Sequence, residues 1–325
     1  MLNKICVVGA GHWGINHIKT LYSLDALGGV VEKDKRALEK IMNLYPGIKG
    51  FGSIIHALQE KEFNGFTVAT PAETHFKIAR SIIETGKHVL VEKPLTLTLE
   101  DAVQLKKLAE LHNVNLMVGH VLLFHPAMQK IKTLINEGKI GKLQYLYSNR
   151  VNLGKVRTEE NVFWSFAPHD ISVFQYFTES KPYKIMSTGG DFLQDGIHDT
   201  TLTVLEYPGN IKGHIFVSWL HPFKEHRLVV VGSEGMISFE DSKEGKPLKL
   251  YSKSFKLNGR IPEKNDGPIE IIDYEQKMPL TEELAYFIDH LDGSQVEIAD
   301  PRSALEVVEI LVKASRSLLE GVPVG

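Results

Sequence analysis

The sequence predicts an α/β protein of two domains, the first with a parallel sheet and the second with a predominantly antiparallel open sheet. Up to about residue 120, short apolar runs alternate with helical segments, which is typical of βαβ units. Beyond that point, strand-like runs are separated by turns rather than by helices. We therefore expect an N-terminal domain over residues 1–121 and a second domain over residues 122–325.

The strands of the first domain are expected to be buried, because each is a compact apolar run of the kind that helices cover on both faces. Five such runs occur, at residues 5–8, 26–31, 66–69, 88–92 and 115–119. Helices are expected between and after them, at residues 15–24, 35–44, 53–59, 75–85 and 99–112. Thr98 and Asp101 resemble a capping box at the start of the last one.

The second domain is expected to contain strands joined by short turns, one of them at Pro208-Gly209-Asn210. The strand-like runs are residues 143–151, 201–207, 211–219, 228–231 and 236–239. Helices are expected at 127–137, at 170–177 with Asp170 as its N-cap, at 282–291 and at 304–319. Residues 241–276 are charged and irregular, which predicts a loop.

The composition is that of an ordinary globular protein, with 43% hydrophobic and 24% charged residues among 325. A net charge of −3 favours neither nucleic acid nor a membrane surface as a partner. The single cysteine, Cys6, fits a reducing compartment, and no signal peptide or membrane-length apolar run is visible. We expect a cytoplasmic protein. No regular ligand spacing indicates a metal site.

The most informative motif is a glycine turn, Gly9-Ala10-Gly11-His12-Trp13-Gly14, between the first strand and the first helix. In this context a Gly-x-Gly-x-x-Gly turn predicts a dinucleotide site. Gly9 would form the tight turn, Gly11 would leave room for the pyrophosphate, and Gly14 would let helix and strand pack closely. The turn, including His12 and Trp13, is the predicted contact with the cofactor.

Glu32 follows the second strand, 18 residues after Gly14. A carboxylate there can accept hydrogen bonds from the adenosine ribose and repel a 2′-phosphate, which favours NAD over NADP. Lys33, Lys35 and Arg36 argue the other way, because they could attract that phosphate. Their alternative interpretation is the solvated start of a helix.

Lys93 is the principal catalytic candidate. It lies in Glu92-Lys93-Pro94, at the carboxyl end of a predicted strand, where open parallel sheets bind their ligands. A partly desolvated lysine beside an oxidised nicotinamide could remove a hydroxyl proton. The alternative is a surface lysine at a strand end. Pro94 follows a strand and is a candidate for a cis peptide bond.

Two further loops could face the cofactor or the substrate. Thr70, Pro71 and His75 follow a predicted strand and open a helix, although plain helix initiation explains most of them. His120 follows another strand end, and a lone histidine there is more often structural.

In the second domain, His169 precedes the expected helix start and is available as an acid/base group or a hydrogen-bond donor. Arginines suit a diphosphate, because the guanidinium fork matches phosphate oxygens. The basic candidates for anion recognition are Arg150, Lys155, Arg157, Lys224 and Arg227.

Taken together, these motifs resemble the glucose–fructose oxidoreductase/inositol dehydrogenase/MocA (Gfo/Idh/MocA) family over essentially the whole chain. The matching landmarks are Val7 to Gly14, Thr70-Pro71 with His75, and Glu92-Lys93-Pro94. The resemblance implies a Rossmann domain, a second α/β domain whose open sheet supports a homodimer or homotetramer, and Lys93 as the catalytic lysine.

Many family members carry an aspartate four residues before the catalytic histidine, and here Ser165 holds that place while His169 is kept. Ser165 could offer only a neutral hydrogen bond. The segment 161–170 resembles the nucleotide-sugar branch of the family, which implies oxidation at C3 of a UDP-linked N-acetylated sugar. Residues His120, Arg150, Arg157, Asn161, Ser165 and His169 are then the substrate-binding candidates. A free sugar or polyol such as inositol is the alternative substrate, and a non-catalytic NAD-binding regulator is the alternative function.

Overall fold

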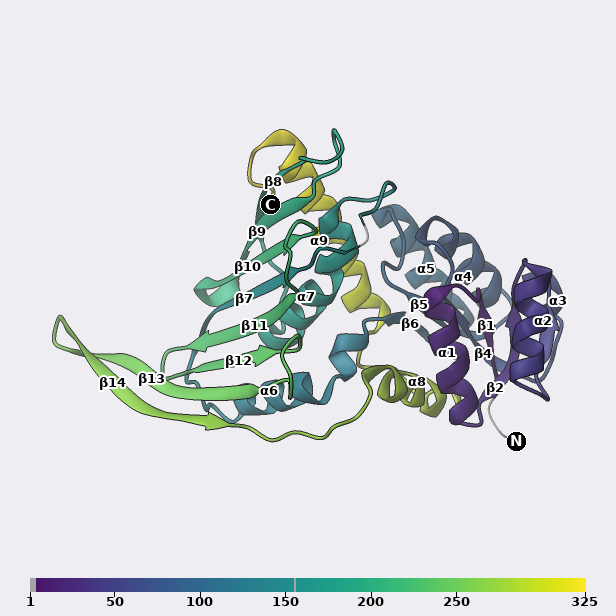
Figure 1. Cartoon of the computed structure of the whole chain (residues 1–325), viewed down its shortest axis with the longest axis horizontal. Helices are drawn as coiled ribbons and strands as arrows, with labels where there is room; N and C mark the ends of the chain where they lie inside the picture. The colour runs from purple at the N-terminus through teal and green to yellow at the C-terminus, as the bar shows by residue number, and fades with distance from the viewer. Residues whose placement is uncertain (1–3, 155) are drawn as a thin grey trace. The chain divides into compact units, whose positions relative to one another are not determined.

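The computed structural model describes residues 4–154 and 156–325 (Figure 1). The chain forms two compact units, and the first unit ends at Phe124 but also takes up Lys277–Val308. The second unit comprises His125–Gln276 and Glu309–Gly325. We expected every residue after 121 to belong to the second domain. That expectation is wrong for Lys277–Val308, which belongs to the first unit.

Packing explains why this segment belongs to the first unit. A Cβ atom on Gly65 would lie 2.6 Å from Leu291 Cδ2, so the segment rests directly on the backbone of a central strand. Asn115 Nδ2 donates to the carbonyl oxygens of His290 and Ser294 at 2.8 and 2.7 Å. Contacts between residues about 175 positions apart are invisible to local sequence patterns.

The first unit contains a six-stranded sheet in which every neighbouring pair is parallel, as the sequence predicted. The strand order is β3-β2-β1-β4-β5-β6. The carboxyl ends of all the strands therefore lie along one edge. The strands are β1 (Lys4–Val8), β2 (Leu27–Val31), β3 (Lys49–Phe51), β4 (Phe63–Val68), β5 (His88–Glu92) and β6 (Leu116–Gly119), of which β3 was not expected.

Helices pack against this sheet in groups, with α1 against α8 and α4 against α5 (Figure 1). Their N-termini follow the local sequence: Asp34 caps α2, and Thr98 caps α5 by accepting from Asp101 N at 3.2 Å. The elements are α1 (His12–Ser23), α2 (Lys35–Leu44), α3 (Ile54–Leu58), α4 (His75–Ile83), α5 (Leu99–His112) and α8 (Pro279–Asp289), with short 3₁₀ turns η1 (Ala72–Thr74) and η2 (Val121–Phe124).

The second unit contains an eight-stranded sheet of order β14-β13-β12-β11-β7-β10-β9-β8. Only the β7–β10 pair is parallel among these strands, so the prediction of a predominantly antiparallel sheet is confirmed. The turn η3 (Pro208–Asn210) joins β9 to β10 as expected. The strands are β7 (Leu143–Val151), β8 (Lys184–Gly190), β9 (Thr200–Tyr207), β10 (Ile211–Ser218), β11 (Glu225–Gly232), β12 (Met236–Glu240), β13 (Leu248–Asn258) and β14 (Ile261–Ile271).

One expectation for this unit was wrong, and one strand was missed. The segment 241–276 is not a loop, because β13 and β14 form a long antiparallel hairpin within it (Figure 1). Nearly all of β14 is exposed, so its side chains lack the alternation of burial that reveals a strand in sequence. The strand β8 was also missed.

A further correction concerns α7 (Val162–Thr178), which was expected to begin at Asp170. Asn161 is its N-cap, and Pro168 lies inside the helix. Pro168 followed by Asp170 imitates a helix start, because proline usually ends a helix and aspartate usually caps one. The remaining helices are α6 (Pro126–Asn136) and α9 (Pro301–Glu320), and α9 begins in the first unit and ends in the second.

No helix in the described part of the chain is long and apolar enough to cross a membrane. Across residues 4–154 and 156–325, no group of three histidine, cysteine, aspartate or glutamate residues is placed to hold a metal ion. Cys6 is fully buried in β1, and burial raises the pKa of its thiol.

Candidate cofactor and catalytic site

The glycine turn has the geometry that a pyrophosphate site requires. Gly9 has a φ of +92°, a left-handed conformation that favours glycine. A Cβ atom on Gly14 would lie 2.1 Å from the carbonyl oxygen of Gly9, so only glycine allows α1 to pack this closely on the turn. A Cβ atom on Gly11 would meet nothing within 4 Å, so open space lies over the backbone there.

The N-terminus of α1 is suited to an anion. Its N-cap is Gly11, no side chain among the described residues caps it, and its first turn holds no acidic residue. The first backbone N–H groups of a helix lack intrahelical partners, and the helix dipole favours negative charge beside them. His12 and Trp13 are exposed around this N-terminus. These features fit the pyrophosphate of a dinucleotide.

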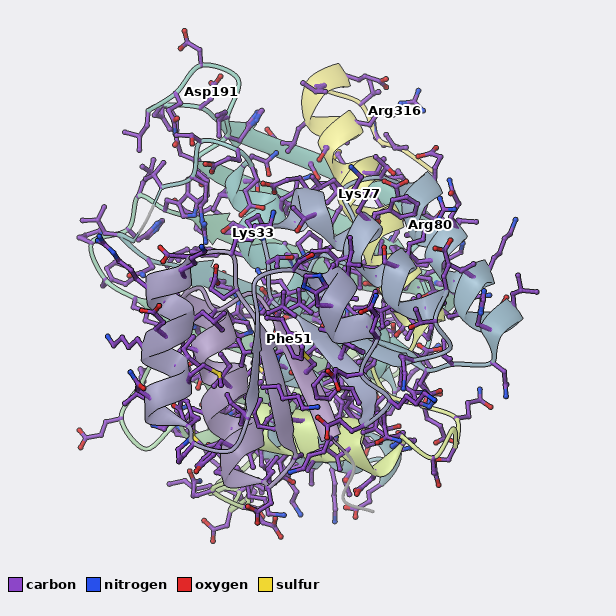
Figure 2. All side chains as sticks on the ribbon, turned by 90° about the vertical axis from the view of Figure 1, so that its right-hand side faces the viewer. Lys33, Phe51, Lys77, Arg80, Asp191 and Arg316 are labelled. Carbon is purple, nitrogen blue, oxygen red and sulfur yellow. The ribbon has the colours of Figure 1, made fainter. Side chains whose placement is uncertain are left out.

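Glu32 lies beside the turn at the carboxyl end of β2. Its Oε2 accepts from Ala10 N at 2.8 Å, and its Oε1 accepts from Asp34 N at 3.0 Å. These two bonds hold the carboxylate between the glycine turn and the start of α2, where an adenosine ribose would be bound. Lys33 lies at the surface of this unit (Figure 2), and Lys35 and Arg36 are exposed as well.

His75 connects the loops that follow β4 and β5. The side chain is buried, with Nδ1 2.8 Å from the carbonyl oxygen of Pro94 and Nε2 2.9 Å from that of Thr70. Carbonyl oxygens only accept, so each of these contacts is a hydrogen bond when the ring nitrogen on that side carries the hydrogen. Thr74 Oγ1 donates to the carbonyl oxygen of Pro71 at 2.7 Å and lies 2.7 Å from Thr70 Oγ1. The structure therefore gives His75 a bridging place between two loops of the predicted site.

Glu92 is buried at the end of β5 and is held by α1. Its Oε1 accepts from Trp13 Nε1 and from His17 Nε2, the latter at 2.8 Å. Its Oε2 accepts from Lys93 N at 3.3 Å. Burial acts to raise the pKa of Glu92, but the interactions with His17 and Trp13 and the charge of Lys93 together outweigh burial and hold that pKa below its usual range. The carboxylate thus joins the helix of the glycine turn to the predicted catalytic lysine, which precedes a cis peptide bond to Pro94.

His120 lies one residue beyond β6 and is buried. Neither ring nitrogen has a hydrogen-bond partner among the described residues. Burial lowers the pKa of His120 to about 4, with the charges of Glu92 and Lys93 acting on it in opposite directions. It is therefore a neutral imidazole at neutral pH, within electrostatic reach of both residues.

Two residues of this region were missed by the sequence reasoning, namely His17 and Glu283. His17 lies four positions after Trp13, so helical spacing places both on one face and could have indicated it. Glu283 is fully buried on α8, four positions before the buried Phe287. A charged residue on the apolar face of a helix was the available signal.

In the second unit, α7 carries the candidates Asn161, Ser165 and His169. Asn161 Oδ1 accepts from Phe163 N and Trp164 N at 3.1 and 3.2 Å, which fixes the start of the helix. Ser165 and His169 are four residues apart on this helix and share a face, with Ser165 buried and His169 half-buried. The expectation that His169 points out of a helix start was wrong, since it lies inside α7.

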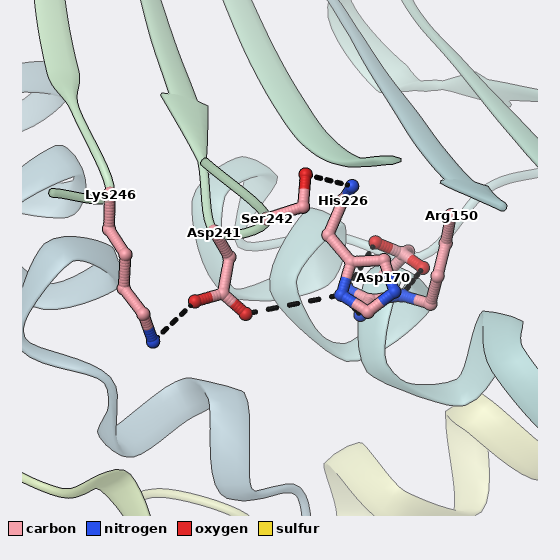
Figure 3. A network of polar contacts seen from close by, with 6 residues as sticks. All are labelled: Arg150, Asp170, His226, Asp241, Ser242 and Lys246. Atoms are coloured by element: carbon pink, nitrogen blue, oxygen red, sulfur yellow. Dashed lines mark hydrogen bonds and ion pairs between the residues drawn. The ribbon is translucent and has the colours of Figure 1, made fainter. Parts of the chain in front are cut away.

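Arg150 belongs to a partly buried polar network in the second unit (Figure 3). Its Nε and Nη2 donate to the carboxylate of Asp170 at 2.8 and 3.1 Å, and its Nη1 lies 3.3 Å from His226 Nδ1. Asp241 lies 4.0 Å from His226 and 2.7 Å from Lys246 Nζ. The contact with His226 and the ion pair with Lys246 hold the pKa of Asp241 below its usual range. The guanidinium group of Arg150 on β7 therefore pairs with the carboxylate of Asp170 on α7.

The other basic candidates have different surroundings. Arg157 is exposed, and its Nε lies 4.0 Å from Glu160. Arg227 Nε lies 3.5 Å from Glu225 and 3.3 Å from Glu240. Lys224 is exposed, and Lys155 lies outside the described residues.

Comparison with known proteins assigns both units to one family. Residues 3–120 match the model of an oxidoreductase family with an NAD-binding Rossmann fold, and residues 128–238 match the Gfo/Idh/MocA C-terminal domain. These two matches cover more than half of the chain. The chain therefore belongs to the Gfo/Idh/MocA family of oxidoreductases, as the sequence motifs predicted.

Individual relatives include dehydrogenases of sugars and polyols. The chain is 29% identical over 185 residues to UDP-N-acetylglucosamine 3-dehydrogenase of Acidithiobacillus ferrooxidans, and the match spans 56% of each protein. It is 26% identical over 256 residues to scyllo-inositol 2-dehydrogenase (NAD(+)) of Bacillus subtilis, covering 72% of each.

Solved structures share the fold over nearly the whole chain. The structure of UDP-N-acetylglucosamine 3-dehydrogenase GnnA from Acidithiobacillus ferrooxidans aligns with a TM-score of 0.85, at 21% identity and with 97% of each chain covered. GenD2 from gentamicin A biosynthesis, solved in complex with NAD, aligns with a TM-score of 0.83, at 23% identity over 99% of this chain and 95% of that one. At these identities the likeness establishes the fold.

Proposed function

We propose that this protein is an NAD-dependent dehydrogenase that oxidises a secondary hydroxyl of a sugar ring. The observation that carries the proposal is the connection of Lys93 to the glycine turn through Glu92, which lies against Trp13 and His17 of α1. NAD, when bound, supplies the hydride acceptor. Glu32 supports NAD over NADP, because its carboxylate would repel a 2′-phosphate.

In this proposal Lys93 removes the proton of the reacting hydroxyl, which lets the carbon-bound hydrogen depart as hydride. His169 of the second unit assists as a second acid/base group. Asn161, Ser165, His120 and Arg157 contact the substrate, Ser165 through a neutral hydrogen bond. Arg150 was a candidate for binding the diphosphate of the substrate. Its guanidinium group already pairs with the Asp170 carboxylate, so we propose that Arg150 positions Asp170 rather than binding the diphosphate.

For the substrate we propose a UDP-linked N-acetylated sugar that is oxidised at C3. The support is the relative named UDP-N-acetylglucosamine 3-dehydrogenase, together with the segment 161–170. A free polyol is the second candidate, favoured by the match to scyllo-inositol 2-dehydrogenase over 72% of the chain.

A substrate panel tests both candidates. The purified protein is mixed with NAD and, in separate reactions, with UDP-N-acetylated hexoses and free polyols including inositol, and NADH is followed by its absorbance. We expect turnover with a UDP-sugar. Turnover with free polyols alone would refute the nucleotide-sugar substrate. Tight NAD binding without turnover across the panel would refute the enzymatic proposal and favour a regulatory protein.

We further propose a cytoplasmic homodimer or homotetramer. Three exposed apolar side chains support the oligomer, Tyr145 on β7, Met186 on β8 and Leu202 on β9. The pairing registers of the four neighbouring strands β7, β10, β9 and β8 place these three side chains on one face of the sheet. Exposed apolar residues grouped on a sheet face are typical of an interface. Light scattering of the purified protein would contradict this if it gave a monomer mass at micromolar concentration.

A further inference from the structure

The first unit contains a group of buried ionisable side chains that interact with Glu92, the residue before the predicted catalytic lysine. We call it the buried acid cluster and define it as His17, Glu92, His120 and Glu283. Glu283 comes from α8, which packs against α1 and η2. None of the comparisons or motifs assigns a role to this residue.

The two carboxyl groups of the cluster have opposite surroundings. Glu92 accepts hydrogen bonds from Trp13, His17 and the backbone of Lys93. Glu283 is 0% exposed, and neither of its carboxyl oxygens has a hydrogen-bond partner among the described residues. A buried carboxylate without hydrogen bonds is far costlier than the neutral acid. Burial raises the pKa of Glu283, and the negative charge of Glu92 raises it further.

Gly119 of β6 also restricts the position of the Glu92 carboxylate, in addition to Trp13 and His17 of α1. Glu92 pairs with Gly119 of β6, and a Cβ atom on Gly119 would lie 2.9 Å from the carboxylate atoms of Glu92. The carboxylate therefore occupies the space that a side chain at position 119 would take. Together with Trp13 and His17, this packing leaves Glu92 little freedom to move away from Lys93.

We propose that Glu92 is the positioning residue of Lys93, and that Glu283 is kept as a neutral acid so that Glu92 is the one anion of the buried acid cluster. In the free protein the charge of Glu92 then favours the ammonium form of Lys93, while neutral His120 and Glu283 add no competing charge. The positive charge of the oxidised nicotinamide acts in the opposite direction, so Lys93 releases this proton to solvent when NAD is bound and can then accept the proton of the hydroxyl. The inference rests on the proposed function for the importance of Lys93. Its tests need no substrate, so they can fail independently of that function.

The first test measures the protonation of Lys93 by competitive labelling with an amine-reactive acyl reagent across pH, read by mass spectrometry. In Glu92→Gln the labelling midpoint of Lys93 should fall by about one pH unit or more, because an adjacent opposite charge is removed. In Glu283→Gln the midpoint should stay that of the wild type, since the substitution replaces one neutral group by another. A comparable fall in Glu283→Gln would show that Glu283 is ionised and would overturn the proposal. An unchanged midpoint in Glu92→Gln would also overturn it.

Lys77 is the internal control in every sample, because it is exposed on α4 (Figure 2) and its midpoint should not respond to either substitution. A change confined to Lys93 separates an electrostatic effect from a general loss of structure. Since Glu92→Gln removes a buried ionic contact and could unfold the protein, Glu283→Gln tests the neutrality of Glu283 independently of that variant.

The second test is the pH dependence of unfolding in urea. Below the pKa of an unfolded glutamate, Glu283 is protonated in both the folded and the unfolded protein. Above that pKa, Glu283 loses its proton in the unfolded protein but keeps it in the folded protein. The free energy of unfolding of the wild type therefore falls as the pH rises. Relative to Glu283→Gln, the wild-type unfolding constant should rise about tenfold per pH unit, or about 1.4 kcal/mol, from pH ~5.5 until Glu283 ionises in the folded state. A ratio independent of pH over this range would show that Glu283 is already ionised and would overturn the proposal.

Discussion

The glycine turn allows a paired test, because alanine should lower folding stability at Gly14 and NAD affinity at Gly11. At Gly14 the new Cβ would lie 2.1 Å from the Gly9 carbonyl oxygen, whereas ordinary contact begins at 3.4 Å. The turn or the helix must therefore move by about 1.3 Å, the difference between these distances. The obstacle is backbone in a buried region, so we expect a net loss of about 1–3 kcal/mol of stability after the gain of about 1 kcal/mol from helix propensity is subtracted.

At Gly11 the same substitution meets nothing within 4 Å, and the φ of −67° suits any residue. Folding stability should change by no more than about 1 kcal/mol, the difference between glycine and alanine at an N-cap. The methyl group would, however, occupy the space proposed for the pyrophosphate. NAD affinity of Gly11→Ala should therefore fall about tenfold or more, a loss of about 1.4 kcal/mol or more of binding free energy.

Urea unfolding gives the stability of each variant, and isothermal titration calorimetry gives its affinity for NAD. The expected pattern is a stable Gly11→Ala protein that binds NAD poorly and a destabilised Gly14→Ala protein. Wild-type NAD affinity in Gly11→Ala would refute the placement of the pyrophosphate. Wild-type stability in Gly14→Ala would refute the argument from close packing.

Three other substitutions give distinct outcomes. Glu32→Ser should weaken NAD binding by about 1.5–3 kcal/mol, the value of charged hydrogen bonds, and shift preference toward NADP; an unchanged NAD/NADP ratio of dissociation constants contradicts this. His75→Ala removes the buried ring that lies between the carbonyl oxygens of Pro94 and Thr70, and it should cost about 1–3 kcal/mol in urea unfolding; a loss below 1 kcal/mol would mean that water replaces the bridge. Asp170→Asn should cost about 3–5 kcal/mol because it leaves Arg150 buried without its counter-charge. The exposed Arg80 (Figure 2) is the control, since Arg80→Ala loses only a surface pair worth about 1 kcal/mol or less.

The parallel sheet could be predicted from sequence because each of its strands is a compact apolar run with a clear beginning and end. The exception is β3, whose three residues Lys49–Phe51 are too short to show a pattern. The predictions failed in the second unit where sequence signals mislead. Pro168 and Asp170 imitate a helix start inside α7, and the exposed strand β14 has no buried face to impose alternation.

In the candidate site, too, the residues that a local pattern requires could be predicted, and those brought in by tertiary packing could not. Gly9, Gly11 and Gly14 could be interpreted in advance, because a fixed local conformation demands them. The supports of Lys93 could not, since they come from distant parts of the chain. His17 and Glu283 reach the end of β5 only through tertiary packing, with Glu283 carried by the segment Lys277–Val308 that returns to the first unit.

The role of Lys93 as the proton acceptor is the central claim, and Lys93→Ala tests it most directly. Turnover of the sugar that the wild type oxidises is compared with NAD affinity in the same preparation, with Lys77→Ala as the matched control. Loss of a positioned general base should lower turnover by about 10²-fold or more. NAD binding should survive, because the glycine turn and Glu32 are unchanged. Near-normal turnover in Lys93→Ala would remove this lysine from the mechanism and contradict the account.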